Sequence, residues 1–342
     1  MEILTHALLA LVLARAGQKL LPRYGAAMLV VSSVAADLDF ASYLGGPSPF
    51  LRFHRAVLHS VPSSVVLICV LAFVFWAFAG RLDAAHPESN RLALSYLAAV
   101  GVCAAGVATH LLLDLASGIG AQLLWPFRQG WTAWNVLSNL DPWVLALLVF
   151  GLLLPELFRL ASEEIGERAK GPRGHRAAIV TLLLLLIYVG ARAGLHSRAV
   201  DELNSRDYRG APPLATAAFP SAISPFAWRG LVSTDNAIDL IEMSLAPGAG
   251  FDPDRAVPHY KPEDSAVLDA AQNTPAAKTF LRYARFPLAG LEREDQGYQF
   301  TLRDLRFAFG DNSADNIIVS VELATDLRVV SQEFRYANLP QR

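Results

Sequence analysis

Histidine and aspartate side chains stand at the ends of four apolar stretches in the first 120 residues. These residues are His6, Asp37, Asp39, His54, His59, His110 and Asp114. Ionisable groups at membrane depth are costly, so they usually mark a functional site. Mixed imidazole and carboxylate donors suit Zn²⁺, Mn²⁺ or Fe²⁺ better than Ca²⁺ or Mg²⁺. The residue types therefore predict a site for one or more divalent transition-metal ions, with zinc the first expectation.

The spacing of these residues adds detail. His110 and Asp114 are four residues apart, so on a helix their side chains share one face about 6 Å apart. Asp37 and Asp39 are two apart, which places both on one side only in an extended or helix-terminal stretch. The candidate metal ligands are His6, Asp37, Asp39, His59, His110 and Asp114. Six candidates predict two or more ions, or one ion with supporting partners.

His54, Arg52 and Arg55 lie beside the candidate ligands. We interpret His54 as a further ligand or as a general acid or base. Arg55, together with Arg52, could hold an anionic phosphate through charge-assisted hydrogen bonds. Anchoring to lipid headgroups is the equal alternative for both arginines.

A simpler interpretation applies to any single one of these residues, because a lone interfacial histidine or helix-end aspartate is common. The joint occurrence favours a site, since adjacent bare carboxylates at a lipid boundary need a cation or hydrogen-bond donors. Four histidines outside the cluster carry no such signal: His86, His175, His196 and His259.

The elements that must position these residues are apolar and long. Hydrophobic types make up 53% of the 342 residues and charged types 18%, against about 25% charged in an average soluble protein. Residues 61–80 and 92–113 are long enough to cross a membrane. Four further stretches bring the number of predicted membrane segments to about six: residues 3–14, 25–36, 143–158 and 177–191.

The distribution of lysine and arginine predicts an orientation. Alternating the six segments gives one face ten basic residues, which the positive-inside rule assigns to the cytoplasm. They are Arg15, Lys19, Arg23, Arg81, Arg91, Arg159, Arg168, Lys170, Arg173 and Arg176. The other face carries Arg52, Arg55 and Arg128. All seven histidines and aspartates then converge on the outer face, and the chain after residue 197 is extracytoplasmic.

The chain is predicted to have two unlike domains, residues 1–196 in the membrane and residues 197–342 outside it. Charged residues number 25 in the first and 35 in the second. Alternating apolar residues predict strands at 238–245, 298–302, 305–309 and 317–323, with turns at 310–313 and 325–326. Residues 211–225, with four prolines, predict a linker or irregular strap. The predicted fold is a membrane all-α helical bundle followed by a β-rich domain.

Short motifs in the membrane half resemble the YdjM-like inner-membrane proteins, a family of metal-dependent hydrolases. They are Thr5-His6, Ala36-Asp37-Leu38-Asp39, the run His-Arg-Ala-Val-Leu-His-Ser at 54–60, and His110-Leu111-Leu112-Leu113-Asp114 followed by Gly120. They cover residues 1–160 and more loosely 161–196. The family commonly has proline at the position of Ala36 and threonine at that of Leu58.

This resemblance implies an inner (cytoplasmic) membrane location of the bacterial type. The family is distantly similar to zinc-dependent phospholipase C and P1 nuclease, helical enzymes whose metal sites cleave phosphodiesters. The resemblance therefore implies phosphoester chemistry for the residues that match, and it does not extend to the β-rich part.

Together these observations predict a membrane-bound metal-dependent hydrolase of phosphoester or lipid-headgroup substrates. A metal-activated water would be the nucleophile, so no serine or cysteine is needed. A net charge of −2 argues against nucleic acid as a partner, and membrane lipids are expected instead. An ion- or proton-coupled transporter and a non-catalytic assembly protein stabilised by metal remain alternatives.

Overall fold

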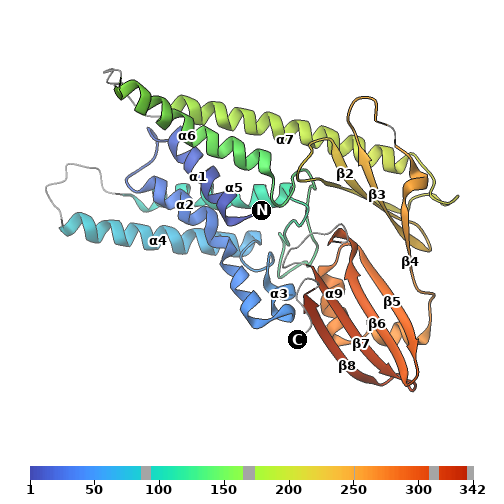
Figure 1. The fold of residues 1–342 in the computed structure, drawn as a ribbon. Helices are drawn as coiled ribbons and strands as arrows, with labels where there is room; N and C mark the ends of the chain where they lie inside the picture. Colours follow the sequence, from blue (N-terminus) through green and yellow to red (C-terminus); the bar gives the residue numbers. More distant parts are fainter. Residues whose placement is uncertain (86–93, 165–173, 250, 308–315, 337–342) are drawn as a thin grey trace. The chain divides into compact units, whose positions relative to one another are not determined.

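The computed structural model describes residues 1–85, 94–164, 174–249, 251–307 and 316–336 (Figure 1). It divides into two compact units. The first combines Met1–Asp39 with Arg55–Gly194, and the second combines Phe40–His54 with Leu195–Arg342. Several residues discussed above lie outside the described ranges: His86, Arg91, Arg168, Lys170, Arg173 and the predicted turn at 310–313.

Each of the six apolar stretches forms a helix, and the stretch at 92–113 is helical from Tyr96 onward. The helices are α1 (Ile3–Ala16), α2 (Gly25–Val34) with the 3₁₀ helix η1 (Ala35–Gly45), α4 (Val61–Ala85), α5 (Tyr96–Ala116), α6 (Pro142–Glu164) and α7 (His175–Asn204). Within the residues that the structure describes, four helical stretches are long and apolar enough to cross a membrane: Gly25–Gly45, Val61–Arg81, Tyr96–Ala116 and His175–Asn204. The apolar stretches in α1 and α6 are shorter. The N-terminal half is thus a helical membrane region with four candidate spans.

A close approach of α2 to α5 brings the candidate ligands of these helices together. A Cβ atom at Gly106 would lie 2.8 Å from the Leu29 carbonyl oxygen and even closer to Ser32 Oγ. Glycine therefore lets the two helices pack with little space between them, as small residues do in membrane proteins. The end of α2 that leads to Asp37 consequently lies beside the end of α5 that carries Asp114.

The second unit contains two four-stranded antiparallel sheets. The first is β1 (Ala215–Pro220), β2 (Ala227–Ser233), β3 (Ala237–Ser244) and β4 (Val257–Tyr260), in that order. The second is β5 (Pro287–Glu294), β6 (Gly297–Asp304), β7 (Ile317–Ala324) and β8 (Val329–Tyr336). The helices α3 (Pro47–Phe53), α8 (Ala266–Gln272) and α9 (Pro275–Tyr283) and the 3₁₀ turn η2 (Pro253–Arg255) belong to the same unit.

The C-terminal part of α7 supplies much of the core on the first sheet. Ala199 and Leu203 are fully buried in one cluster with Trp228. A Cβ atom at Gly230 would lie 2.7 Å from a methyl group of Leu203. The glycine therefore makes room for the helix on the sheet, and β3 is buried along most of its length.

Three details of the second unit correct the sequence predictions. β1 lies inside the predicted strap at 211–225, because its residues pair with β2 along their whole length. The alternation at 305–309 is not a strand, since Leu305–Phe307 forms the 3₁₀ turn η3 and the last two residues are not described. The helices α8 and α9 were missed, although Ser265 and Thr274 cap them in the expected way.

Candidate metal centre

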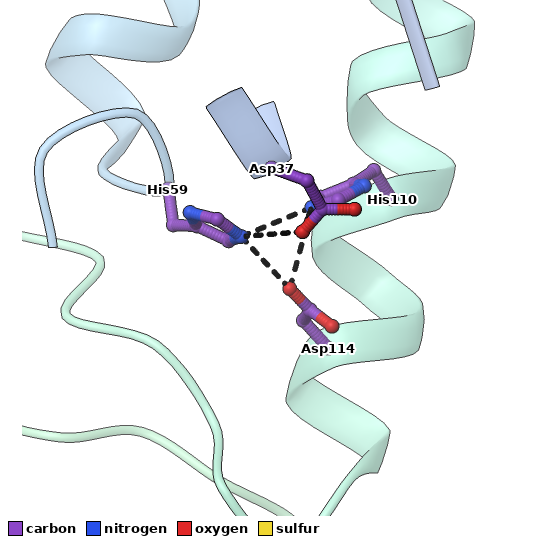
Figure 2. A group of neighbouring side chains, drawn as sticks. All are labelled: Asp37, His59, His110 and Asp114. Atoms are coloured by element: carbon purple, nitrogen blue, oxygen red, sulfur yellow. Dashed lines mark hydrogen bonds and ion pairs between the residues drawn. The ribbon is translucent and has the colours of Figure 1, made fainter. Parts of the chain in front are cut away.

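Four buried side chains converge at the ends of the membrane helices (Figure 2). Asp37 comes from η1, His59 from the turn before α4, and His110 and Asp114 from successive turns of α5. Each offers one donor atom, and these atoms all lie within 4.8 Å of one another. The predicted sharing of a helix face by His110 and Asp114 is confirmed, because both side chains point into this group.

The distances between the donor atoms suit a small cation. Nε2 of His59 lies 3.0 Å from both His110 Nε2 and Asp114 Oδ2, and His110 Nε2 lies 3.3 Å from Asp114 Oδ2. Asp37 Oδ1 is 3.8 Å from each histidine Nε2. Tetrahedral bonds of about 2.0–2.1 Å would separate donors by about 3.3–3.4 Å. The observed separations bracket this value.

Hydrogen bonds on the far side of each imidazole decide which nitrogen faces the group. His110 Nδ1 lies 2.6 Å from the Ser33 carbonyl oxygen, which can only accept, so this nitrogen must carry the proton. His59 Nδ1 likewise faces Asp39 Oδ2 at 2.8 Å. In the neutral rings both Nε2 lone pairs therefore point at the group, which is the arrangement of metal-binding histidines.

The four converging donors require a positive charge between them. Two Nε2 lone pairs would otherwise face each other beside two carboxylates, and Asp114 Oδ2 receives no hydrogen bond of good geometry from the described residues. Burial lowers the pKa of His59, but Asp39 and Asp114 outweigh it and raise this pKa to about 9. A second proton on His59 or a bound cation would satisfy the group, and four converging donors fit a cation.

The other oxygen of Asp114 faces a different set of groups. Its Oδ1 lies 3.2 Å from Arg55 Nη1 and 3.4 Å from His6 Nε2, and it also accepts from the Met1 amino group. The His6 ring stacks on His110 with centroids 3.9 Å apart. Asp114 therefore connects the other three converging donors to a cationic neighbour, Arg55.

The structure thus brings all six candidate ligands together, but only four of them point into the converging group. Asp37, His59, His110 and Asp114 form the converging group. Asp39 binds the outer nitrogen of His59 and the backbone N–H of Arg55, and His6 lies against His110 and Asp114. His54 belongs to the second unit, where its ring stacks on Phe50 at 4.5 Å.

Backbone carbonyls, among them those of Ser33 and Gly120, support the group. Ser33 was not singled out from the sequence, and its carbonyl orients His110. The Gly120 carbonyl accepts a hydrogen bond from Arg55 Nη1 at 3.4 Å. A Cβ atom at Gly120 would lie 2.2 Å from the Thr132 carbonyl oxygen, and its φ of +76° favours glycine. The sequence holds no signal for the carbonyl of Ser33, because any residue has one.

Comparisons with known proteins agree with the membrane half of this description. A family model, "YdjM inner membrane protein", matches residues 1–198. The "Uncharacterized protein YfhP" of Bacillus subtilis (strain 168) is 25% identical over 115 residues. The aligned stretch is 34% of this chain and 32% of YfhP, so this chain covers about a third of that relative. No solved structure matches the chain.

The family match takes in more than half of the 342 residues and includes every residue of the candidate metal centre described above. It ends before the first strand of the C-terminal sheets. The resemblance seen in the short motifs is therefore confirmed for the membrane half. The chain belongs to the YdjM inner membrane protein family.

Proposed function

We propose that the protein is a membrane-bound metal-dependent hydrolase of phosphoester or lipid-headgroup substrates, with zinc as its metal. The observation that carries the proposal is the buried group of two imidazoles and two carboxylates, whose donors converge with their outer hydrogen bonds already made. This donor set suits zinc better than calcium or magnesium. A bound divalent cation would supply Lewis acidity and an activated water.

The protein groups around this centre have separate tasks. Asp37, His59, His110 and Asp114 would hold the cation. Arg55 offers a buried guanidinium on the Oδ1 side of Asp114, where it would bind a phosphate oxygen and neutralise charge. Its positive charge also disfavours a second cation at that oxygen, so we infer a single ion.

The direction of substrate entry follows from the exposure of the ligands. The side chains of His59, His110 and Asp114 are fully buried, whereas Asp37 is 8% exposed. Asp37 is also the donor farthest from the two histidine nitrogens, at 3.8 Å. Water and substrate would therefore approach the centre on the Asp37 side.

A loop beside the site favours a substrate that is embedded in the membrane. The connection from α5 to α6 exposes Leu124, Phe127 and Trp134, with 85% of Phe127 accessible. The N–H of Val61, the first residue of α4, donates to the Leu123 carbonyl oxygen at 2.9 Å. Aromatic side chains near helix ends favour the membrane interface, so they would bring the site to the level of lipid headgroups.

A structural metal site is the second candidate function. Four protein ligands around one ion is the usual pattern of structural zinc, whereas catalytic zinc keeps one position open. In that case the C-terminal domain would be the working part of an assembly protein. The transporter alternative has less support, because the converging ionisable groups lie at helix ends instead of through the membrane depth.

The decisive test is hydrolysis by the purified full chain in lipid nanodiscs, loaded with zinc. We expect release of a phosphorylated headgroup from one of a panel of anionic and zwitterionic lipids, and its loss in Asp37→Asn. A zinc-loaded chain that cleaves no phosphoester would favour the structural site. A proton or ion flux that depends on Asp37 and His110 would establish the transporter.

The orientation in the membrane is part of the proposal. We propose six membrane segments with the metal centre and C-terminal domain outside the cytoplasm, since ten basic residues against three favour it. In a background without Cys69 and Cys103, cysteines at Ser48 and Asp235 are expected to react with an impermeant reagent in intact cells. A cysteine at Lys19 should react only after permeabilisation. The reverse pattern would refute this orientation.

A further inference from the structure

The segment between the two groups of site residues belongs to the C-terminal unit. This segment, the Phe40–His54 loop, contains the end of η1 and all of α3. α3 packs against α9 and β8 (Figure 1). Arg52 Nη2 donates to Thr279 Oγ1 at 3.3 Å, and the rings of Tyr43 and Tyr336 lie 5.0 Å apart. The C-terminal domain therefore binds the Phe40–His54 loop, which lies in the N-terminal half of the sequence.

The interior of the Phe40–His54 loop is packed around one aromatic ring. Phe50 is fully buried, and its ring centroid lies 4.5 Å from His54, 5.8 Å from Phe40 and 5.9 Å from Tyr43. Aromatic rings at these separations attract one another. Because the loop is packed around Phe50, we expect a displacement of α3 to move both ends of the loop.

The two ends of the loop meet at the metal centre. Asp39 precedes the loop and Arg55 follows it, and the Arg55 backbone N–H donates to Asp39 Oδ2 at 3.0 Å. The same oxygen binds His59 Nδ1. Arg55 has a φ of +56°, a conformation that costs a non-glycine residue energy unless its surroundings hold it. Its guanidinium pairs with Asp114.

We propose that the C-terminal domain positions the metal centre through the Phe40–His54 loop. By holding α3, the domain sets the Asp39–Arg55 contact, and this contact orients the His59 imidazole and the Arg55 guanidinium. Asp39 and Arg55 act here as positioning residues. The inference rests on the metal site of the proposed function, but it does not depend on hydrolysis.

The expected size of the effect follows from similar contacts. Removing an outer hydrogen-bond partner of a metal ligand lowers metal affinity about 10- to 100-fold. The contacts between the C-terminal domain and α3 reach the metal ligands only through the Asp39–Arg55 contact. We therefore expect the loss of the contacts with α3 to lower zinc affinity about five- to tenfold, below the direct effect.

The test weakens the contacts between α3 and the C-terminal domain without changing a candidate metal ligand. In the full chain in nanodiscs, Arg52→Met combined with Tyr43→Leu removes the hydrogen bond to Thr279 and the ring contact with Tyr336. Zinc affinity is measured by competition with a chelator, and hydrogen exchange is measured on the same sample. We expect weaker zinc binding and faster exchange in α3, with unchanged exchange in the strands. Arg52→Lys with Tyr43→Phe should restore both values.

Lys278→Met is the matched control, because Lys278 is exposed on α9 next to Thr279. It should bind zinc like the parent. Faster exchange in α3 with zinc affinity within about twofold of the parent would overturn the inference. If hydrogen exchange in α3 is not faster in the double variant, Phe50→Ala is used in its place. Faster exchange with zinc affinity within about twofold of the parent would again overturn the inference. A parent chain that binds no zinc refutes both proposals, whereas weaker zinc binding in a chain without hydrolase activity supports this inference alone.

Discussion

Replacing His110 with alanine is expected to remove nearly all bound metal from the purified protein. The imidazole supplies one of four converging donors, and its Nε2 lies 3.3 Å or less from two of the others. Loss of an outer partner already costs about 10- to 100-fold in affinity, so loss of a donor should cost more than about 100-fold. Metal per chain, measured by elemental analysis after dialysis, checks this result.

A second substitution distinguishes loss of a metal ligand from loss of folding. His110→Ala leaves the Ser33 carbonyl without its partner, at a cost of about 1–3 kcal/mol. Asp37→Asn keeps the shape of its side chain and removes only its charge, and it should also lose most of the metal. His175→Ala and His259→Ala serve as controls, because neither histidine belongs to the converging group. Parental metal content in both His110→Ala and Asp37→Asn would contradict the assignment.

Replacing Arg55 with alanine is expected to lower kcat/KM for an anionic phosphoester about ten- to a hundredfold, measured on protein saturated with metal. A charge-assisted hydrogen bond contributes about 1.5–3 kcal/mol. Arg55→Ala also removes the partner of Asp114. Arg55→Lys is therefore the sharper variant, because it keeps the positive charge and loses only the planar pair of donors. It should recover part of the lost activity.

The backbone at Arg55 makes lysine a fair comparison. Both residues share the same strain at a φ of +56°, so the difference between them reports the side chain. Arg128→Ala is the matched control, since Arg128 is an exposed arginine of the α5–α6 connection. Full activity in Arg55→Lys would show that a bidentate contact with phosphate is not required.

Much of the membrane half follows from the sequence. A long apolar run has to form a helix in lipid, because no water is present to pair with its backbone groups. Ionisable residues in such runs are rare and costly, so His110 and Asp114 stand out without an alignment. The spacing of four also predicts that they share a face. The C-terminal half follows less well: β7 was predicted, but α8 and α9 are each under ten residues, too short for periodicity to detect.

The sequence by itself determined the helical membrane segments and the six residues that gather at their ends, because burial cost and hydrophobic length are properties of composition. Only the tertiary structure decided their places. Asp37 and Asp39 lie in a 3₁₀ helix, where residues two apart point in different directions. One faces the converging donors and the other faces His59 Nδ1. His54 stacks on Phe50 in a loop that also contacts Thr279, more than 200 residues later in the chain. Contacts over such distances leave no local pattern in the chain.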